Sequence, residues 1–314
     1  MAETSGLNKP WLVAAWPGMG NVGLNALVYL LAKLEMRMFS ELESGDLFDI
    51  DDVEVQGGLI QSPQRPRNRL FWWKDPAGRH DLLLLLGEAQ PPVGKYAFCR
   101  QVISQAKEYG VERVITFAAM ATSIHPRQPS RAFGAATSKE GLRDLRRLEA
   151  EPLEEGHVGG LNGVLVGAAL EAGIEGMFLL GELPQVLLRL VYPKASRAIL
   201  EVFTRMAGLE LDFRELDSQV DELDRRLQIV MDETESPEEF EEFEGKEAGG
   251  GTASFPPPTK ERLSAKDRAE IDDLFQKATL DRTRAFELKQ LLDRLGAFAI
   301  YEDRFLDLFR SHES

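Results

Sequence analysis

As far as about residue 210, short continuously apolar runs alternate with longer stretches of helical periodicity. The runs predict buried strands at 11–16, 82–86, 113–120 and 176–180, and the leucines of 82–86 indicate a strand covered on both faces. Further strands are predicted at 36–42, 53–61, 68–74 and 131–137, and helices at 24–34, 95–109, 139–148, 156–173 and 193–207. This succession favours an α/β fold: a mostly parallel central sheet with helices on both sides.

The pattern changes after residue 210. Apolar positions from Leu216 to Val230 recur in steps of four and three, which predicts a helix that packs on a partner surface. Residues 232–260 combine an acidic run with GGGTAS and PPP, a composition typical of a disordered linker. From 264 to 310 the periodicity predicts two or three amphipathic helices, attached to the sheet domain or to a neighbouring subunit. We therefore expect an α/β domain (1–231), a linker (232–260) and a C-terminal helical extension (261–314).

Composition narrows the class of protein. The chain is 43% hydrophobic and 28% charged, and its 314 residues can bury one large core or two modest ones. Of the net charge of −15, residues 232–247 contribute −8, and no basic face is evident, so we expect no nucleic-acid partner. No run is long and apolar enough to cross a bilayer, and no signal-peptide pattern is evident, so we expect a cytoplasmic protein with no membrane partner.

A glycine turn follows the first predicted strand. Gly18, Gly20 and Gly23 form G-x-G-x-x-G before an apolar helix, and with Asn21 they make a candidate anion-binding loop. Pro17 precedes the first glycine, and the chain after 36–42 runs into an apparent hairpin, which counts against a dinucleotide site. A dinucleotide site, another anion or nucleotide site and a purely structural turn are the three alternatives, and we favour the structural turn.

Two carboxylates make a second candidate site. Glu88 follows LLLLLG and Glu182 follows FLLG, so the ends of two strands offer an acid and a base that can converge on one crevice. The plainer interpretation is that each carboxylate accepts backbone amide hydrogen bonds at the start of a loop. Ser123 and His125 also follow a strand end, but two polar residues in one loop do not make a catalytic set.

Metal binding is not expected. The histidines at 80, 125, 157 and 312 lie at no metal-ligand spacing, and Cys99 is the only cysteine, placed in the middle of a predicted helix. No G-x-S-x-G, P-loop or H-E-x-x-H pattern occurs. We therefore expect no cofactor, no metal and no catalytic residues.

Several motifs together carry a family likeness. The sequence resembles the proteasome assembly chaperone 2 family in WPGMGNVG (16–23), LLLLLGEAQP (82–91), GVERVITFAAM (110–120), GGLNGVLVGAALEAGI (159–174) and the stretch 179–212. The likeness implies a fold like that of purine nucleoside phosphorylases without an accepted catalytic site. It also implies an assembly chaperone that binds proteasome α-subunits, and no established ligand for the glycine turn.

One departure concerns the chaperones' C-terminal docking tail of a hydrophobic residue, tyrosine and any residue. The chain ends Arg310-Ser311-His312-Glu313-Ser314, and Ile300-Tyr301-Glu302 lies inside a predicted helix, so we do not expect proteasome docking by that route. We expect a non-catalytic protein-binding or assembly-chaperone-like protein that forms a homo-oligomer. The alternative is a phosphate- or nucleoside-binding enzyme or sensor that uses the Gly18–Gly23 loop.

Overall fold

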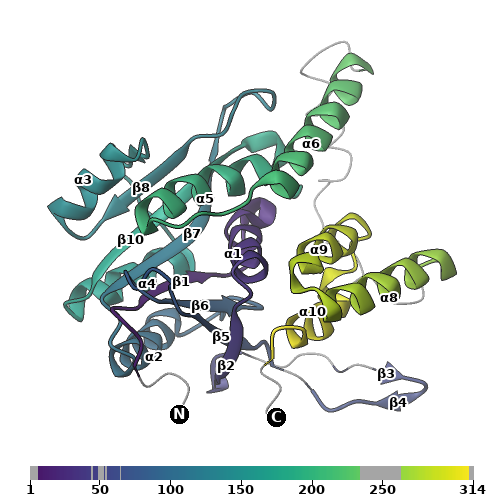
Figure 1. Cartoon of the computed structure of the whole chain (residues 1–314), viewed down its shortest axis with the longest axis horizontal. Helices are drawn as coiled ribbons and strands as arrows, with labels where there is room; N and C mark the ends of the chain where they lie inside the picture. Colours follow the sequence, from purple (N-terminus) through teal and green to yellow (C-terminus); the bar gives the residue numbers. More distant parts are fainter. Residues whose placement is uncertain are drawn as a thin grey trace.

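The chain builds one large sheet, shown in the computed structural model in Figure 1. The structure describes residues 6–43, 45–48, 53, 55–63, 65–233 and 263–310. The eight strands lie in the order β2-β5-β6-β1-β7-β10-β8-β9. Their bounds are β1 Trp11–Ala15, β2 Arg37–Leu42, β5 Asn68–Trp73, β6 Leu82–Gly87, β7 Arg113–Thr122, β8 Ala132–Ala136, β9 Glu151–Pro152 and β10 Glu175–Pro184.

The centre of the sheet is parallel and fully covered. β1 pairs in parallel with β6 and β7, and β7 pairs in parallel with β10. Successive side chains of β1 enter opposite cores: Val13 belongs to one, and Leu12 and Ala14 to the other. β5, β2 and β8 add antiparallel pairs at the flanks. The predicted mostly parallel α/β sheet, covered on both sides, is confirmed.

Helices cover both faces of this sheet. α1 (Val22–Lys33) and α5 (Pro193–Ala207) pack on one face, and α2 (Lys95–Glu108) and α4 (Gly160–Glu171) on the other. α3 (Lys139–Arg147) lies beside β8. Short 3-10 turns precede or link these elements: η1 Met19–Asn21, η2 Gly45–Leu47 and η3 Gln185–Leu187.

The C-terminal helices belong to the same core. α8 (Ala265–Leu280), the turn η5 (Arg282–Arg284), α9 (Ala285–Arg294) and α10 (Phe298–Asp307) form three helices, and η5 and α9 lie against α1. Figure 1 shows α1 between the sheet and these yellow helices. Residues 22–32 of α1 are therefore all buried, which explains why this stretch is apolar nearly all round. The extension attaches to the sheet domain of its own chain.

Two local predictions need correction. Residues 53–61 do not form one strand, because Gly57 and Gly58 both take positive φ and turn the chain between β3 (Val55–Gln56) and β4 (Leu59–Ile60). The helix predicted from 216 to 230 is α6 (Arg214–Glu233), whose Leu216 and Leu227 are buried against this chain's own core, with α5 as neighbour.

Most of the predicted linker lies outside the residues that the structure describes. Of residues 232–260, Asp232 and Glu233 end α6 and the rest lie outside the described residues, as do 311–314.

Candidate functional site

The glycine turn is closed by the protein's own backbone. The Gly20 amide donates to the Leu188 carbonyl at 2.8 Å, and the Asn21 amide donates to the Gly18 carbonyl at 3.0 Å. The amide of Val22 donates to Met19. Three amides of the turn, those of Gly20, Asn21 and Val22, therefore already have backbone acceptors.

Two of the glycines allow close approach of backbones. A Cβ on Gly23 would lie 2.2 Å from the Phe117 carbonyl oxygen of β7. Gly20 has φ +56°, and a Cβ there would lie 3.1 Å from the Leu190 carbonyl oxygen. Gly23 thus lets α1 lie directly on the sheet, and Gly20 lets the loop after β10 lie on the turn.

A second helix start at the same edge is also occupied. The Gln90 side chain accepts a hydrogen bond from the Leu161 amide at 3.0 Å and donates to the Pro17 carbonyl at 3.1 Å. One side chain from the loop after β6 thereby joins the glycine turn to the first turn of α4. The Leu161 amide therefore has a protein acceptor at the edge where doubly wound folds often hold ligands.

The same loops expose apolar side chains. Four residues form what we call the rim patch: Met19, Leu188, Leu190 and Val191. Leu190 is 53% exposed and Met19 is 42% exposed, and the hydrogen bond from Gly20 to Leu188 keeps their two loops together. A group of exposed apolar residues on adjacent loops is typical of a protein-interaction surface.

The structure does not bring the two candidate carboxylates together. Glu88 follows β6, Glu182 lies in β10, and β1 and β7 separate these strands. Three strand spacings place β6 and β10 about 14 Å apart. Each carboxylate has its own cationic neighbour, Arg131 for Glu182 and Arg69 for Glu88.

Glu182 is held as a carboxylate. It is fully buried, and it accepts hydrogen bonds from Arg131 Nη2 at 2.7 Å and Thr122 Oγ1 at 2.7 Å. Burial raises its pKa, but these hydrogen bonds outweigh burial, so the pKa of Glu182 lies below its ordinary value. A carboxyl in this state is poorly suited to act as a general acid near neutral pH.

Glu88 belongs to a second ionic cluster. Its side chain accepts hydrogen bonds from Arg69 Nη1 at 2.6 Å and from the Arg67 backbone amide at 2.8 Å. Arg69 is fully buried, and its other terminal nitrogen donates to Asp303 of α10 at 2.5 Å. Glu88 therefore helps to attach the C-terminal helices.

The other candidates form no catalytic set that the structure shows. Ser123 and His125 are exposed, and His125 Nδ1 accepts the Arg127 amide at 3.3 Å. Cys99 is buried, and His80 stacks on Trp11 with ring centroids 3.8 Å apart. Among the residues that the structure describes, no three His, Cys, Asp or Glu side chains gather to hold a metal ion. Within the same residues, no helix is both long and apolar enough to span a bilayer.

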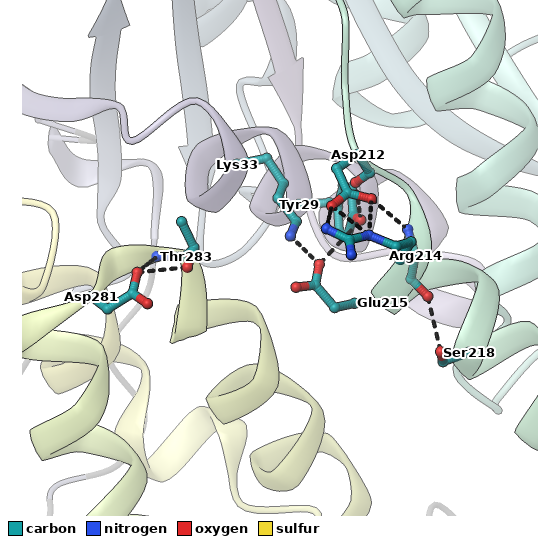
Figure 2. A network of polar contacts seen from close by, with 8 residues as sticks. All are labelled: Tyr29, Lys33, Asp212, Arg214, Glu215, Ser218, Asp281 and Thr283. Carbon is teal, nitrogen blue, oxygen red and sulfur yellow. Dashed lines mark hydrogen bonds and ion pairs between the residues drawn. The ribbon is translucent and has the colours of Figure 1, made fainter.

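The end of α1 carries a further polar network, shown in Figure 2. The Tyr29 hydroxyl donates to the Asp212 carbonyl at 2.6 Å, and Lys33 pairs with Glu215 at the start of α6. Burial, together with Glu215, raises the pKa of Tyr29 well above its ordinary value. The network ties α1 to the segment between α5 and α6, and it gives Lys33 an acidic partner, Glu215, at the start of α6.

Sequence reasoning missed the cationic members of these clusters. Arg69, Arg131 and Lys289 are each paired with acids far away in the chain or on a neighbouring helical turn. Arg69 lies within the apolar stretch NRLFWW, and this was the available signal, because a charge inside a buried strand requires a partner. The apolar residues around Leu190 lie within the family-like stretch 179–212, and the sequence carries no local signal of their exposure.

Comparisons with known proteins locate the similarity in the sheet domain. The sequence profile described as the PAC2 family matches residues 12–231. The uncharacterized protein MJ1210 of Methanocaldococcus jannaschii is 25% identical over 227 residues, which is 71% of this chain and 84% of MJ1210.

Two solved structures also align with most of this chain. Pyrococcus furiosus PbaB, described as an archaeal proteasome activator, aligns with a TM-score of 0.62 and 25% identity over 72% of this chain and 95% of PbaB. The Mycobacterium tuberculosis proteasome-assembly chaperone homologue Rv2125 aligns with a TM-score of 0.63 and 20% identity over 74% of this chain and 99% of Rv2125.

Proposed function

This chain belongs to the PAC2 family, and from that premise we propose that it is a non-catalytic, assembly-chaperone-like protein that binds another protein through the rim patch. One observation carries the proposal. In the turn that carries phosphate in dinucleotide-binding folds, the amides of Gly20, Asn21 and Val22 donate to backbone carbonyls, and the loops that meet there expose apolar side chains. The relatives described as a proteasome activator and an assembly-chaperone homologue support the same class of function.

The chemistry of the rim patch fits a protein partner. Burying the exposed part of a half-exposed leucine contributes about 1 kcal/mol to binding, so several such side chains supply a useful core for an interface. Leu190 and Val191 follow Arg189, which is also exposed and offers a polar contact beside the apolar ones. The patch therefore combines an apolar centre with a charged neighbour, as protein interfaces do.

Binding can be tested with two matched substitutions. We propose Leu190→Asp in the rim patch and Leu280→Asp at the end of α8, where Leu280 is 90% exposed and far along the chain. Full-length protein with each substitution is used to recover partners from native cells by affinity capture with quantitative mass spectrometry. Leu190→Asp should reduce a stoichiometric partner at least about tenfold, because it places a charge in the interface, whereas Leu280→Asp should leave recovery unchanged.

Two outcomes contradict the proposal. If both substitutions leave the partner bound equally, the rim patch is not the contact. If phosphate or a nucleotide raises the melting temperature of the wild-type protein and the shift disappears in Gly20→Val, the glycine turn binds an anion, which favours the sensor or enzyme alternative. At a concentration of 100 times Kd, such a ligand stabilises by about 2.7 kcal/mol, which is readily detected.

The proposal includes two further expectations. We propose that the protein self-associates into a homo-oligomer and that it works in the cytoplasm. Sedimentation velocity measures the first and fractionation of native cells the second. A strictly monomeric protein at all concentrations contradicts the first, and recovery in a membrane or extracellular fraction contradicts the second.

A further inference from the structure

The C-terminal helices contact one another as well as the core that they share with the sheet domain. We call residues 263–310 the C-terminal unit and residues 6–233 the body. Within the unit, Phe275 of α8 lies against Tyr301 of α10 with ring centroids 5.9 Å apart, and Arg304 of α10 pairs with Asp272 of α8 at 2.5 Å. Ser264 caps α8 by accepting the Asp267 amide. The unit thus has internal apolar and ionic contacts that do not involve the body.

The unit lies on a continuous face of the body, which we call the docking face. This face consists of the outer side of α1 and the free edge of β2 with neighbouring β5. Phe286 packs edge-on against Tyr29 of α1 with centroids 4.4 Å apart, and Phe309 packs against Phe71 of β5 at 6.4 Å. The Met38 amide of β2 donates to the Phe309 carbonyl at 2.8 Å, so the unit forms an isolated bridge to the edge strand of the sheet.

Buried charges hold the unit on this face. Arg69 is fully buried between Glu88 of the body and Asp303 of the unit. Lys289 of the unit is 2% exposed, and its Nζ reaches Asn25 of α1 at 3.2 Å and Asp293 at 2.5 Å. Burial lowers the pKa of Lys289, against the opposing effect of Asp293.

Such an interface is suited to opening. Burying charges has a large desolvation cost, and that cost is recovered when the two faces separate and become hydrated. The family profile ends at residue 231, and 72% of this chain covers 95% of PbaB, so the body corresponds to the fold that the relatives share.

We propose that the C-terminal unit is a detachable cover over a protein-docking face formed by α1 and the free edge of β2. The unit is the resident occupant of that face. A partner that replaces it must present the same groups: a helical segment with an acidic side chain for Arg69 and aromatic side chains for Tyr29 and Phe71. This inference concerns a surface other than the rim patch and stands without it.

A neighbouring acid makes the attachment dependent on pH. The groups that face Glu302 are Arg69 and Glu88 of the body and Lys289 and Asp303 of the unit. Burial, reinforced by Glu88, raises the pKa of Glu302 to about 7. Because this folded-state pKa is above the ordinary value, the attachment is strongest at low pH and weakens as pH rises through about 7.

Hydrogen exchange on the full chain tests the cover. The Met38 amide reports attachment because its acceptor, Phe309, belongs to the unit, whereas amides of β1 report global unfolding. In the wild type, Met38 and the amides of α9 and α10 should exchange together through an opening that leaves β1 protected. Exchange of Met38 only at the rate of β1 would show that the unit is an integral part of the core and would overturn the proposal.

Two adjacent substitutions give opposite expectations. Asp303→Asn removes a charged acceptor from Arg69 and should increase the opening constant roughly tenfold or more without changing the exchange of β1. Glu302→Gln removes the ionising group and should decrease the opening constant at pH 8 but leave it unchanged at pH 5. If both substitutions change the opening constant equally at both pH values, the attachment of the unit does not depend on these charges and the reasoning is refuted.

Cleavage of the folded protein between the body and the C-terminal unit tests whether the docking face accepts a unit from another molecule. A protease recognition sequence inserted after Gly250 in the full-length protein is cleaved after folding, and an excess of isotope-labelled, identically cleaved protein is added. Native mass spectrometry should show labelled units on unlabelled bodies, with a faster exchange in Asp303→Asn. If no units exchange below the temperature at which the body unfolds, the face does not accept a segment supplied by another molecule and the proposal fails.

Discussion

Replacing Gly23 by alanine tests the structural role of the glycine turn directly. Gly23 lies in the first turn of α1, where this helix touches the backbone of the central strand β7. An added Cβ would lie 2.2 Å from the Phe117 carbonyl oxygen and 2.6 Å from the Phe117 carbonyl carbon. Because β7 is paired with β1 and β10 on its two sides, the helix rather than the strand must move.

The size of the destabilisation follows from how short this contact would be. Ordinary contact begins at 3.4 Å, so α1 has to move about 1.2 Å away from β7 at this point. Overpacking of a core costs about 1–3 kcal/mol, and a clash against backbone places Gly23→Ala at the upper end. A loss of about 3 kcal/mol lowers Tm by about 6–12 °C in a chain of this size.

A matched control lies in another helix. Gly167 of α4 is exposed, has ordinary helical φ, and nothing lies within 4 Å of the Cβ that alanine would add. Gly167→Ala should therefore stabilise by about 0.5–1 kcal/mol. Gly18, which has extended φ, is a second control within the turn itself, and Gly18→Ala should change stability little.

Urea unfolding followed by circular dichroism measures all three variants. Gly23→Ala should lower the transition midpoint with an unchanged m-value, because stability rather than the denatured state is altered. If Gly23→Ala unfolds within about 1 kcal/mol of wild type, or if it behaves like Gly167→Ala, then close packing of α1 on β7 is not the reason for the glycine.

Three further predictions concern single side chains. Tyr29→Phe removes the hydrogen bond to the Asp212 carbonyl and should lower stability by about 1 kcal/mol, seen as a Tm about 2–4 °C lower in calorimetry. Glu182→Gln should destabilise the protein by about 1–3 kcal/mol at pH 7, and this difference should shrink on acidification. Because the pKa of Glu182 in the folded protein is lowered, the stability that its carboxylate contributes is present above about pH 4.5 and is lost as pH falls through the folded-state pKa. An equal loss of stability at all pH values would contradict this. Burial raises the pKa of Cys99 to about 12, so iodoacetamide at pH 8 should alkylate this thiol only after denaturation, as mass spectrometry would show, and rapid labelling of native protein would refute it.

Periodicity in the sequence predicted the elements well where burial alone sets the pattern. The five leucines of 82–86 became β6, covered on both faces, and the apolar stretch from 24 became most of α1. The prediction of strand 53–61 was wrong because two positive-φ glycines turn the chain, a backbone property that a hydrophobic pattern does not report. The three C-terminal helices were also predictable, but the sequence left open whether they cover their own chain or another.

In the candidate site too, the sequence predicted local features but not the contacts between distant segments. The G-x-G-x-x-G spacing identified the turn before α1, but the acceptor of the Gly20 amide is Leu188, which comes from a loop far along the chain. Likewise, Glu88 follows β6 as expected, but Glu182 lies within β10, which continues to Pro184, and the separation of the two carboxylates by β1 and β7 follows from strand order. Local spacing does not encode strand order.

The sequence by itself determined the central buried strands, the main helices and that the whole is an α/β sheet, because side-chain polarity and backbone preference act locally. The tertiary structure alone decided what each buried face touches. Arg69 finds Asp303, and α1 lies beneath α9, only because chain segments distant in sequence meet across the sheet. Contacts of this kind depend on the closure of long loops and on the pairing of desolvated charges, and neither has a local signature in the chain.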